Sequence, residues 1–163
     1  MARFFDELPH TAIEEARASK KPLVAILPVG ATESHGPHMP LNTDVIISEG
    51  MARRAADLLD ADRMQAFVLP SLAYTPADYA SGFSGTISIQ PSTLHALLDD
   101  IAAALKRQGF VCLALANSHF DPANVGVLRE AAKRIEATGL KVAFADATRR
   151  NVATQLTDEF KSG

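Results

Sequence analysis

Four apolar runs, separated by stretches with helical patterns, constrain the fold of this chain most strongly. The runs are rich in Val, Leu, Ile and Phe, and they span Leu23–Pro28, Ala66–Leu69, Phe110–Ala116 and Lys141–Ala145. Such runs with little polar alternation are typical of parallel strands that are covered by helices on both faces. We therefore predict an α/β fold of three layers, α/β/α, with a mostly parallel central sheet.

Five helical stretches are expected around these runs. Thr11 to Glu14 matches a capping box, so the first helix should continue to about Lys20. The second spans Asp44–Asp60, and its apolar residues should form one face of the helix: Val45, Ile46, Met51, Ala55, Leu58 and Leu59. The other three are expected at 91–108, ended by Gly109, at Pro122–Thr138, ended by Gly139, and at Thr148–Asp158.

The bulk properties indicate one globular domain over residues 1–163, with 47% hydrophobic and 21% charged residues. A net charge of −3 gives no basic surface for nucleic acid, and no run of about 18 apolar residues is present for a membrane span. The acidic N-terminal segment, interrupted by Pro9, does not fit a signal peptide. The single cysteine, Cys112, should occupy a buried strand position, and a cytoplasmic location is expected.

A cluster of possible metal ligands follows the first apolar run. Glu33, His35 and Asp44 lie in a loop that also holds His38. Glu33 and His35 are two residues apart, so in extended backbone their side chains point the same way and can reach one ion or two adjacent ions. As an alternative, Asp44 or Thr43 could simply cap the helix that begins there.

A second cluster, Asn117-Ser-His119-Phe-Asp121, follows the third apolar run. His119 is expected to be a ligand together with Asp121, although Asp121 before Pro122 also fits a helix N-cap. The carboxyl ends of parallel strands meet at one edge of a sheet, where ligands bind in such folds. The two clusters should therefore share a single site.

The other histidines have weaker patterns. His38 is expected either to contact substrate or to support the ligands from behind. His10 and His95 lie on a linker and in the first turn of an exposed helix, so neither is expected to take part.

The segment from Gly30 to Asp44, GATESHGPHMPLNTD, resembles the signature of the creatininase (creatinine amidohydrolase) family. Gly85-Thr-Ile-Ser followed by a helix, and then Asn117-Ser-His119, resemble later blocks of that family in the same order. The resemblance extends from about Leu27 to Gly163.

The resemblance implies a hydrolase with two divalent metal ions, zinc or manganese with iron(II) as a further option, and often a hexameric homo-oligomer. Transferred position by position, Glu33, Asp44 and His119 would hold one ion, and His35, Asp44 and Asp121 the other. Asp44 would bridge the two ions. Such a pair activates a water molecule that attacks the amide carbonyl, and Asp121 or His38 is then expected to deliver a proton to the leaving nitrogen.

The chain departs from the family pattern at three places. Asp121 stands where Glu or Gly is common, and the loop from Tyr74 to Ser84 lacks the usual Glu-His and Phe-Pro residues. Family members usually continue beyond the position of Gly163 into a His-Ala-Gly-Glu-x-Glu-Thr block. The sequence is therefore expected to be a C-terminally incomplete, creatininase-like domain.

The leading functional prediction is a metal-dependent amidohydrolase that cleaves a C–N bond in a small cyclic amide. A formamide hydrolase and a peptide-trimming relative are alternatives with the same chemistry. An alternative of another class is a non-catalytic subunit in which the metal site serves binding or assembly. The cluster loops contain no Arg or Lys, which is unfavourable for a phosphate-bearing substrate.

Overall fold

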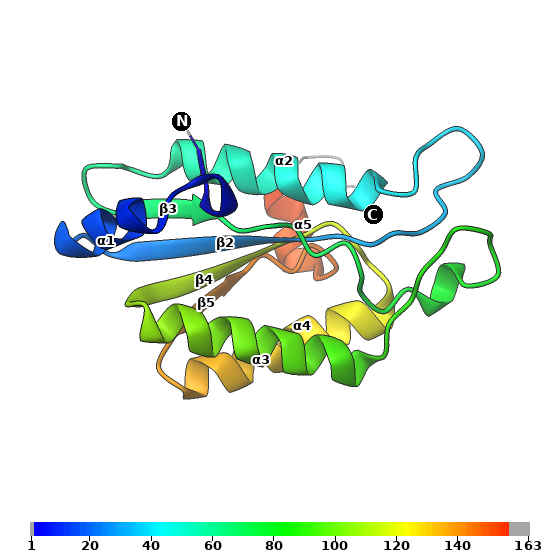
Figure 1. Ribbon diagram of the computed structural model, residues 1–163. Coiled ribbons are helices and arrows are strands. Elements are labelled where there is room, and N and C mark those ends of the chain that lie inside the picture. Colours follow the sequence, from blue (N-terminus) through cyan, green and yellow to red (C-terminus); the bar gives the residue numbers. More distant parts are fainter. Residues whose placement is uncertain (1, 157–163) are drawn as a thin grey trace.

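The computed structural model describes residues 2–156, which form a five-stranded sheet between layers of helices (Figure 1). The strands lie in the order β1-β3-β2-β4-β5, and each of these neighbours is paired in parallel. Their bounds are β1 Arg3–Phe4, β2 Leu23–Val29, β3 Gln65–Val68, β4 Phe110–Asn117 and β5 Lys141–Phe144. The predicted fold class is confirmed, and each predicted strand lies within one residue of an observed one.

The strand that the sequence did not predict is β1. It has two residues, Arg3 and Phe4, which pair with Phe67 and Val68 of β3 through the backbone. Two residues are too few to show the period or the apolar run that marks a strand, so the sequence carries no signal for this pairing.

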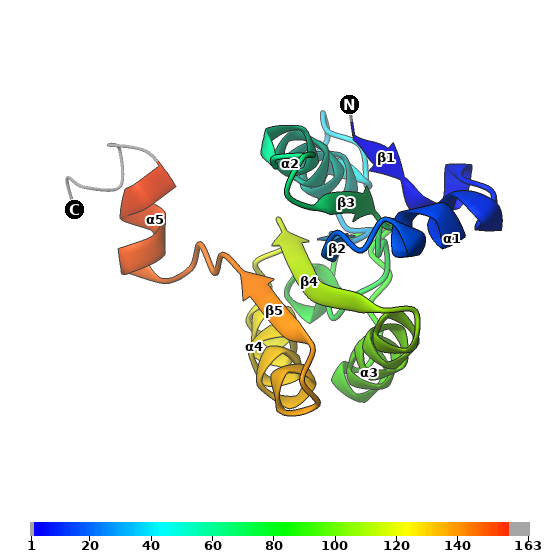
Figure 2. The same ribbon diagram turned by 90° about the vertical axis from the view of Figure 1, so that its left-hand side faces the viewer.

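The helices are α1 His10–Ala18, α2 Thr43–Leu58, α3 Pro91–Arg107, α4 Pro122–Ala137 and α5 Arg150–Leu156, with short 3-10 turns at Phe5–Glu7 and Asp78–Ala80. Helix α2 covers one face of the sheet, and α3 and α4 cover the opposite face (Figure 2). Gly109 and Gly139, with φ of 87° and 94°, follow α3 and α4 as predicted. The end predicted for the last helix, Asp158, lies outside the described residues.

The capping box predicted at Thr11 is wrong. Helix α1 begins at His10, its N-cap is Pro9, and no side chain caps it. Because the proline ring fixes φ at −69° and the backbone of Pro9 is extended, the helix starts directly after it. Thr11 is therefore already inside the first turn.

The predicted apolar face of α2 is not the face that packs on the sheet. Ile46, Met51 and Leu58 are exposed, whereas the buried residues of α2 are Asp44, Ser48 and Ala52. Small residues allow this helix to lie close to the sheet. The close approach, rather than hydrophobic periodicity, therefore decides which face of α2 turns inward.

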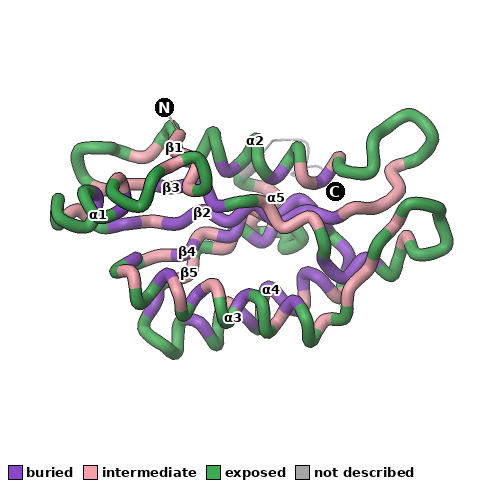
Figure 3. Tube along the Cα trace, in the orientation of Figure 1, coloured by how far each residue is buried: buried purple, intermediate pink, exposed green. Residues whose placement is uncertain are grey.

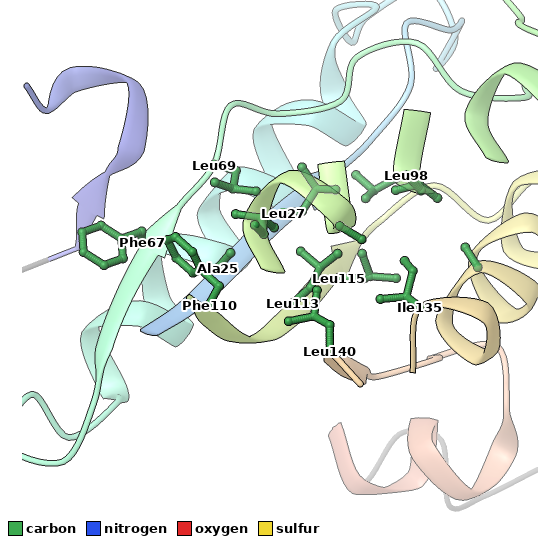
Figure 4. Packing of buried hydrophobic residues seen from close by; sticks show 14 of the residues in the cluster. Ala25, Leu27, Phe67, Leu69, Leu98, Phe110, Leu113, Leu115, Ile135 and Leu140 are labelled. Carbon is green, nitrogen blue, oxygen red and sulfur yellow. The ribbon is translucent and has the colours of Figure 1, made fainter. Parts of the chain in front are cut away.

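The main core lies between the sheet and the layer that contains α3 and α4. Phe67 and Phe110 pack edge to face with ring centroids 5.9 Å apart, and leucines from several elements fill the rest (Figure 4). A smaller cluster around Ile26, Ala52 and Val68 lies on the side of α2. In Figure 3 the central strand β2 is accordingly almost entirely buried, whereas the edge strand β5 alternates between exposed and intermediate residues.

Cys112 lies on β4 as predicted, but it is half-buried rather than buried. It lies on the same face of the strand as Ala114 and Ala116, which are partly buried and pack against the smaller cluster. This face of β4 is less well covered than the face toward α3 and α4.

The strand order places a crevice at the ends of β2 and β4. These neighbours are paired up to Val29 and Asn117, and the chain leaves β2 toward α2 on one face and leaves β4 toward α4 on the other. A topological switch point of this kind is where open α/β sheets bind ligands. Within residues 2–156, no helix combines the length and apolar character that crossing a membrane would need.

Candidate metal centre

A pocket lies at this crevice and contains residues from both predicted clusters. Its lining comes from the loop after β2, the start of α2, the turn at Asp78–Ala80 and the connection from β4 to α4. The lining residues are Glu33, His35, Asp44, Tyr79, Ser118, His119, Phe120, Asp121 and Pro122. The two clusters therefore share one site in the structure.

Glu33 and His35 are presented by a loop that is fixed by backbone hydrogen bonds. The amide of Glu33 donates to the carbonyl of Leu41 over 3.0 Å, and the amide of Ser34 donates to the hydroxyl of Thr86 over 3.1 Å. His35 Nε2 lies 3.6 Å from Glu33 Oε1, so the two side chains point toward the same place, as their spacing predicted.

Asp44 lies in the first turn of α2 and is 4% exposed. Gly30 allows this position, because a Cβ there would lie 2.6 Å from the backbone nitrogen of Val45. The hydroxyl of Ser118 donates to the carbonyl of Asp44 over 2.6 Å and ties α2 to the end of β4. The N-cap of α2 is Asn42, without a side-chain cap, so the alternative that Asp44 or Thr43 caps the helix is wrong.

His119, which is 2% exposed, completes a group of four side chains. Its Nδ1 lies 3.2 Å from Glu33 Oε1 and 3.0 Å from Asp44 Oδ2. His35 Nε2 lies 3.3 Å from the other oxygen of Asp44, Oδ1. Asp44 thus turns one carboxylate oxygen toward each histidine.

The tautomer of His119 follows from its second contact. Nε2 lies 2.8 Å from the carbonyl oxygen of Pro76, which can only accept, so Nε2 carries the hydrogen. In the neutral imidazole the lone pair of Nδ1 then faces two carboxylates. A cation at this place, either a proton or a metal ion, removes the repulsion between these groups.

The pKa values of the site reflect this crowding. Burial raises the pKa of Glu33, the neighbouring Asp44 carboxylate raises it further, and the nearby histidines offset this only in part. Burial alone would lower the pKa of His119, but the contacts with Asp44, Pro76 and Glu33 outweigh it and raise the pKa. Both groups hold a proton more firmly than usual when no metal ion is bound.

The residues fit a divalent metal ion. Glu33, His35 and Asp44 offer ligand atoms that all lie within 4.8 Å of one another. His35 Nε2 and Asp44 Oδ2 are buried and form no hydrogen bond, although ionisable groups surround them. Mixed carboxylate and imidazole ligands suit zinc and manganese. A bound ion would give both atoms the partner that the protein does not supply.

Asp121 is buried at the edge of the pocket and caps α4, as its alternative interpretation predicted. Its Oδ1 accepts from the amide of Ala123 over 2.8 Å, and its Oδ2 accepts from the amide of Tyr79 over 3.1 Å. Each oxygen keeps a second lone pair, so the cap is compatible with binding an ion. Its role as a ligand stays a prediction.

The remaining histidines lie apart from the group of four. His38 is exposed and does not line the pocket, so its predicted catalytic role stays a prediction. His10 is the first residue of α1, and His95 contacts Glu130 of α4 over 3.2 Å.

Sequence reasoning missed Asn124, a fully buried residue of α4. Its Nδ2 donates to the carbonyl of His119 over 2.8 Å and to Asn117 Oδ1 over 3.0 Å. Asn117 Nδ2 donates to the same carbonyl of His119 over 2.8 Å. Together the two amides fix the turn that presents His119. An asparagine near a helix start is common at surfaces, so no sequence signal distinguished Asn124.

Comparison with known sequences gives related proteins with two activities. Creatinine amidohydrolase of Pseudomonas putida is 38% identical over 112 residues, which are 66% of this chain and 41% of that protein. A mycofactocin precursor peptide peptidase of Mycobacterium tuberculosis is 34% identical over 122 residues, which are 70% of this chain and 46% of that protein. The matched segments thus span less than half the length of these relatives.

Solved structures agree with this relationship. A manganese form of creatininase superposes with a TM-score of 0.73 at 28% identity and covers 98% of this chain and 65% of its own. A Zn–Zn form of a creatininase point mutant (TM-score 0.72, 29% identity) covers 98% and 65%. A mutant complexed with creatine (TM-score 0.72, 28% identity) covers 100% and 65%. The family model Creatininase, described as creatinine amidohydrolase, matches residues 6–162, and the chain therefore belongs to this family.

Proposed function

We propose that this protein is a metal-dependent hydrolase that cleaves a C–N bond of a small cyclic amide. The observation that carries the proposal is the position of Asp44 between His35 and His119, with one carboxylate oxygen toward each ring. Two divalent ions, Zn²⁺ or Mn²⁺, bound on either side of Asp44 would activate a water molecule and polarise the amide carbonyl.

We assign the ligands as the family resemblance implies. Glu33, Asp44 and His119 would hold one ion, and His35, Asp44 and Asp121 the other. The contacts of Glu33 and Asp44 with His119 support the first set. Asp121 lines the same pocket and retains free lone pairs, which supports its place in the second.

The leaving nitrogen needs a proton once the C–N bond breaks. Asp121 and His38 are the two groups that the sequence predicted for this step. Of these, Asp121 lines the pocket and His38 lies exposed outside the lining. We therefore propose that Asp121 passes the proton released by the attacking water to the leaving nitrogen, and we retain His38 as a proposed contact for substrate.

The pocket offers no side-chain cation to a phosphate-bearing substrate. Its lining includes three carboxylates and two histidines, and the lining residues include no Lys or Arg. Two bound divalent ions would neutralise these carboxylates, and a phosphate group would find no Lys or Arg side chain among the lining residues. Tyr79 and Phe120 are exposed at the pocket and offer ring faces to a planar amide. Creatinine is the natural first test compound, because a relative is a creatinine amidohydrolase.

Peptide trimming is a second candidate, supported by the similarity to the mycofactocin precursor peptide peptidase. The same residues would act on a peptide bond near a chain end. The exposed rings of Tyr79 and Phe120 would then contact a side chain of the peptide.

The test is to supply the purified protein with Zn²⁺ or Mn²⁺ and to measure conversion of creatinine to creatine and cleavage of short peptides. The matched control is Glu33→Gln, which keeps the shape of a ligand and removes its charge. Creatinine turnover that is lost in this variant supports the proposal, and turnover of peptides alone favours the second candidate. A protein that binds metal but turns over neither compound supports the binding or assembly role instead.

A further inference from the structure

A segment that contributes no ligand crosses the back of the metal pocket and is fixed to it at three points. The hydroxyl of Thr75 donates to the carbonyl of Gly30 over 2.8 Å. The carbonyl of Pro76 accepts from Nε2 of His119 over 2.8 Å, and the amide of Tyr79 donates to Oδ2 of Asp121 over 3.1 Å. The segment 75–79 is thus attached to the end of β2 and to both site residues of the connection from β4 to α4.

The inner part of this segment is buried and its end is exposed. Thr75, Pro76 and Ala77 are buried, and the amide of Ala77 donates to the hydroxyl of Ser88 over 2.9 Å. Tyr79 is 84% exposed and lines the pocket together with Phe120. The buried residues therefore determine the position of the Tyr79 backbone at the edge of the pocket.

The contact between Pro76 and His119 couples this segment to the ion. A metal ion on Nδ1 withdraws electron density from the imidazole ring and makes Nε2–H a stronger donor. The hydrogen bond to the Pro76 carbonyl is then strengthened when the ion binds. By linkage, a bound ion and a fixed position of Pro76 favour each other by the same coupling free energy.

We infer that the segment 75–79 is a metal-coupled wall of the substrate pocket, and that the ion on His119 fixes Tyr79 as a substrate-contact residue. Pro76 acts as a positioning residue through its carbonyl, and Thr75 acts as one through its hydroxyl. This inference rests on the metal site of the proposed function, but it concerns the position of the wall and not the reaction.

Hydrogen exchange measured by mass spectrometry tests the coupling without any substrate. The intact protein is compared in chelator and with saturating Zn²⁺. We expect Zn²⁺ to slow exchange of the Tyr79 amide by about threefold to tenfold, because local opening of the wall becomes less frequent. The amides of the buried face of α3 around Leu98 serve as the internal reference and should not change. Equal exchange of the Tyr79 amide in both states overturns the inference.

The reciprocal effect is tested with Thr75→Val, which removes the hydroxyl and keeps the branched shape. We expect its Zn²⁺ affinity to fall by up to about tenfold, because Thr75 holds its neighbour Pro76, whose carbonyl is the supporting contact behind His119. Thr138→Val is the matched control, because Thr138 donates to the carbonyl of Ile135 at the far end of α4. Tyr79→Ala should bind Zn²⁺ as the unmodified protein does.

The outcomes separate this inference from the proposed function. If Zn²⁺ protects the Tyr79 amide but the protein hydrolyses nothing, the inference about the wall holds and the proposed hydrolysis is wrong. If the protein hydrolyses the amide but Zn²⁺ does not protect Tyr79, the proposed function holds and the inference about the wall is wrong. A protein that binds neither Zn²⁺ nor Mn²⁺ in such a titration overturns both.

Discussion

At the scale of single residues, four side chains surround the candidate metal position: Glu33, His35, Asp44 and His119. Glu33→Gln and His119→Ala should each abolish tight binding of at least one ion, because the first removes the charge of a ligand and the second removes a ligand atom. Elemental analysis after dialysis measures this. His95→Ala is the control, since His95 contacts Glu130 on the helical surface and should keep its full metal content. Equal metal content in all three variants would refute the ligand set.

The raised pKa values of Glu33 and His119 give a pH dependence with a definite sign. Their ordinary values are 4.5 and 6.5, and in the metal-free fold both groups bind protons more tightly than in the unfolded chain. The stability that these two groups contribute is complete at a pH below their ordinary pKa values. It is lost as the pH rises through their pKa values in the folded protein. A bound ion should compensate for that loss.

We therefore expect the increase in Tm on adding Zn²⁺ to be larger at about pH 7.5 than at about pH 5.5, where protons compete with the ion. Calorimetry with chelator and with Zn²⁺ at both pH values measures the two increases. An increase that does not depend on pH would show that protons and the ion do not share the site.

The residues of the site were predicted unequally from the sequence. Glu33 and His35 could be paired because a spacing of two fixes their direction in extended backbone, and the structure brings them together. The support of His119 by Asn124 and by the Pro76 carbonyl could not be predicted. A backbone carbonyl has no sequence signature, and Asn124 becomes a partner only when α4 packs behind the turn.

At the scale of elements, the close approach of α2 to β2 positions Asp44. Gly30→Ala should separate them, because the new Cβ would lie 2.8 Å or less from backbone atoms of Asp44 and Val45. We expect a loss of roughly 1–3 kcal/mol in the free energy of unfolding, as for overpacking, together with weaker Zn²⁺ binding. Denaturant unfolding and a metal titration measure the two effects.

Gly50→Ala is the matched control in the same helix. A Cβ at Gly50 meets no atom within 4 Å, so alanine should stabilise the protein by up to about 1 kcal/mol and leave metal binding unchanged. If Gly30→Ala were as stable as Gly50→Ala and bound Zn²⁺ normally, the close contact between β2 and α2 would not be what positions Asp44.

The elements themselves were predictable where a long periodic pattern or a terminal residue marks them. The runs that became β2 and β4 and the helices ended by Gly109 and Gly139 are of this kind. The inward face of α2 was not, because Ser48 and Ala52 are buried by proximity to the sheet rather than by hydrophobicity. Tertiary packing overrides local pattern at that helix.

At the scale of the whole molecule, topology explains why two clusters far apart in the sequence form one site. The sheet order β1-β3-β2-β4-β5 makes β2 and β4 neighbours, and their carboxyl ends face the same crevice. The expectation of a parallel sheet was enough to predict this shared edge without the strand order. The segment 75–79 arrives from the connection between β3 and α3. The family resemblance singled out the loop from Tyr74 to Ser84, but no periodicity or polar spacing predicted that this segment would cross the pocket.

The homo-oligomer expected from the family resemblance stays a prediction. The exposed residues Ile46, Ile47 and Met51 of α2 form an apolar surface in the described chain. Light scattering coupled to size-exclusion chromatography determines the number of subunits directly.

The central claim is that Asp44 lies between two divalent ions, and the metal stoichiometry of the chain tests it most directly. Elemental analysis of protein purified without chelator should give about two equivalents of zinc or manganese per chain, as in two-metal hydrolases. About one equivalent would mean that Asp44 does not bridge. A folded protein that contains no metal and takes up none when Zn²⁺ or Mn²⁺ is added would contradict the account.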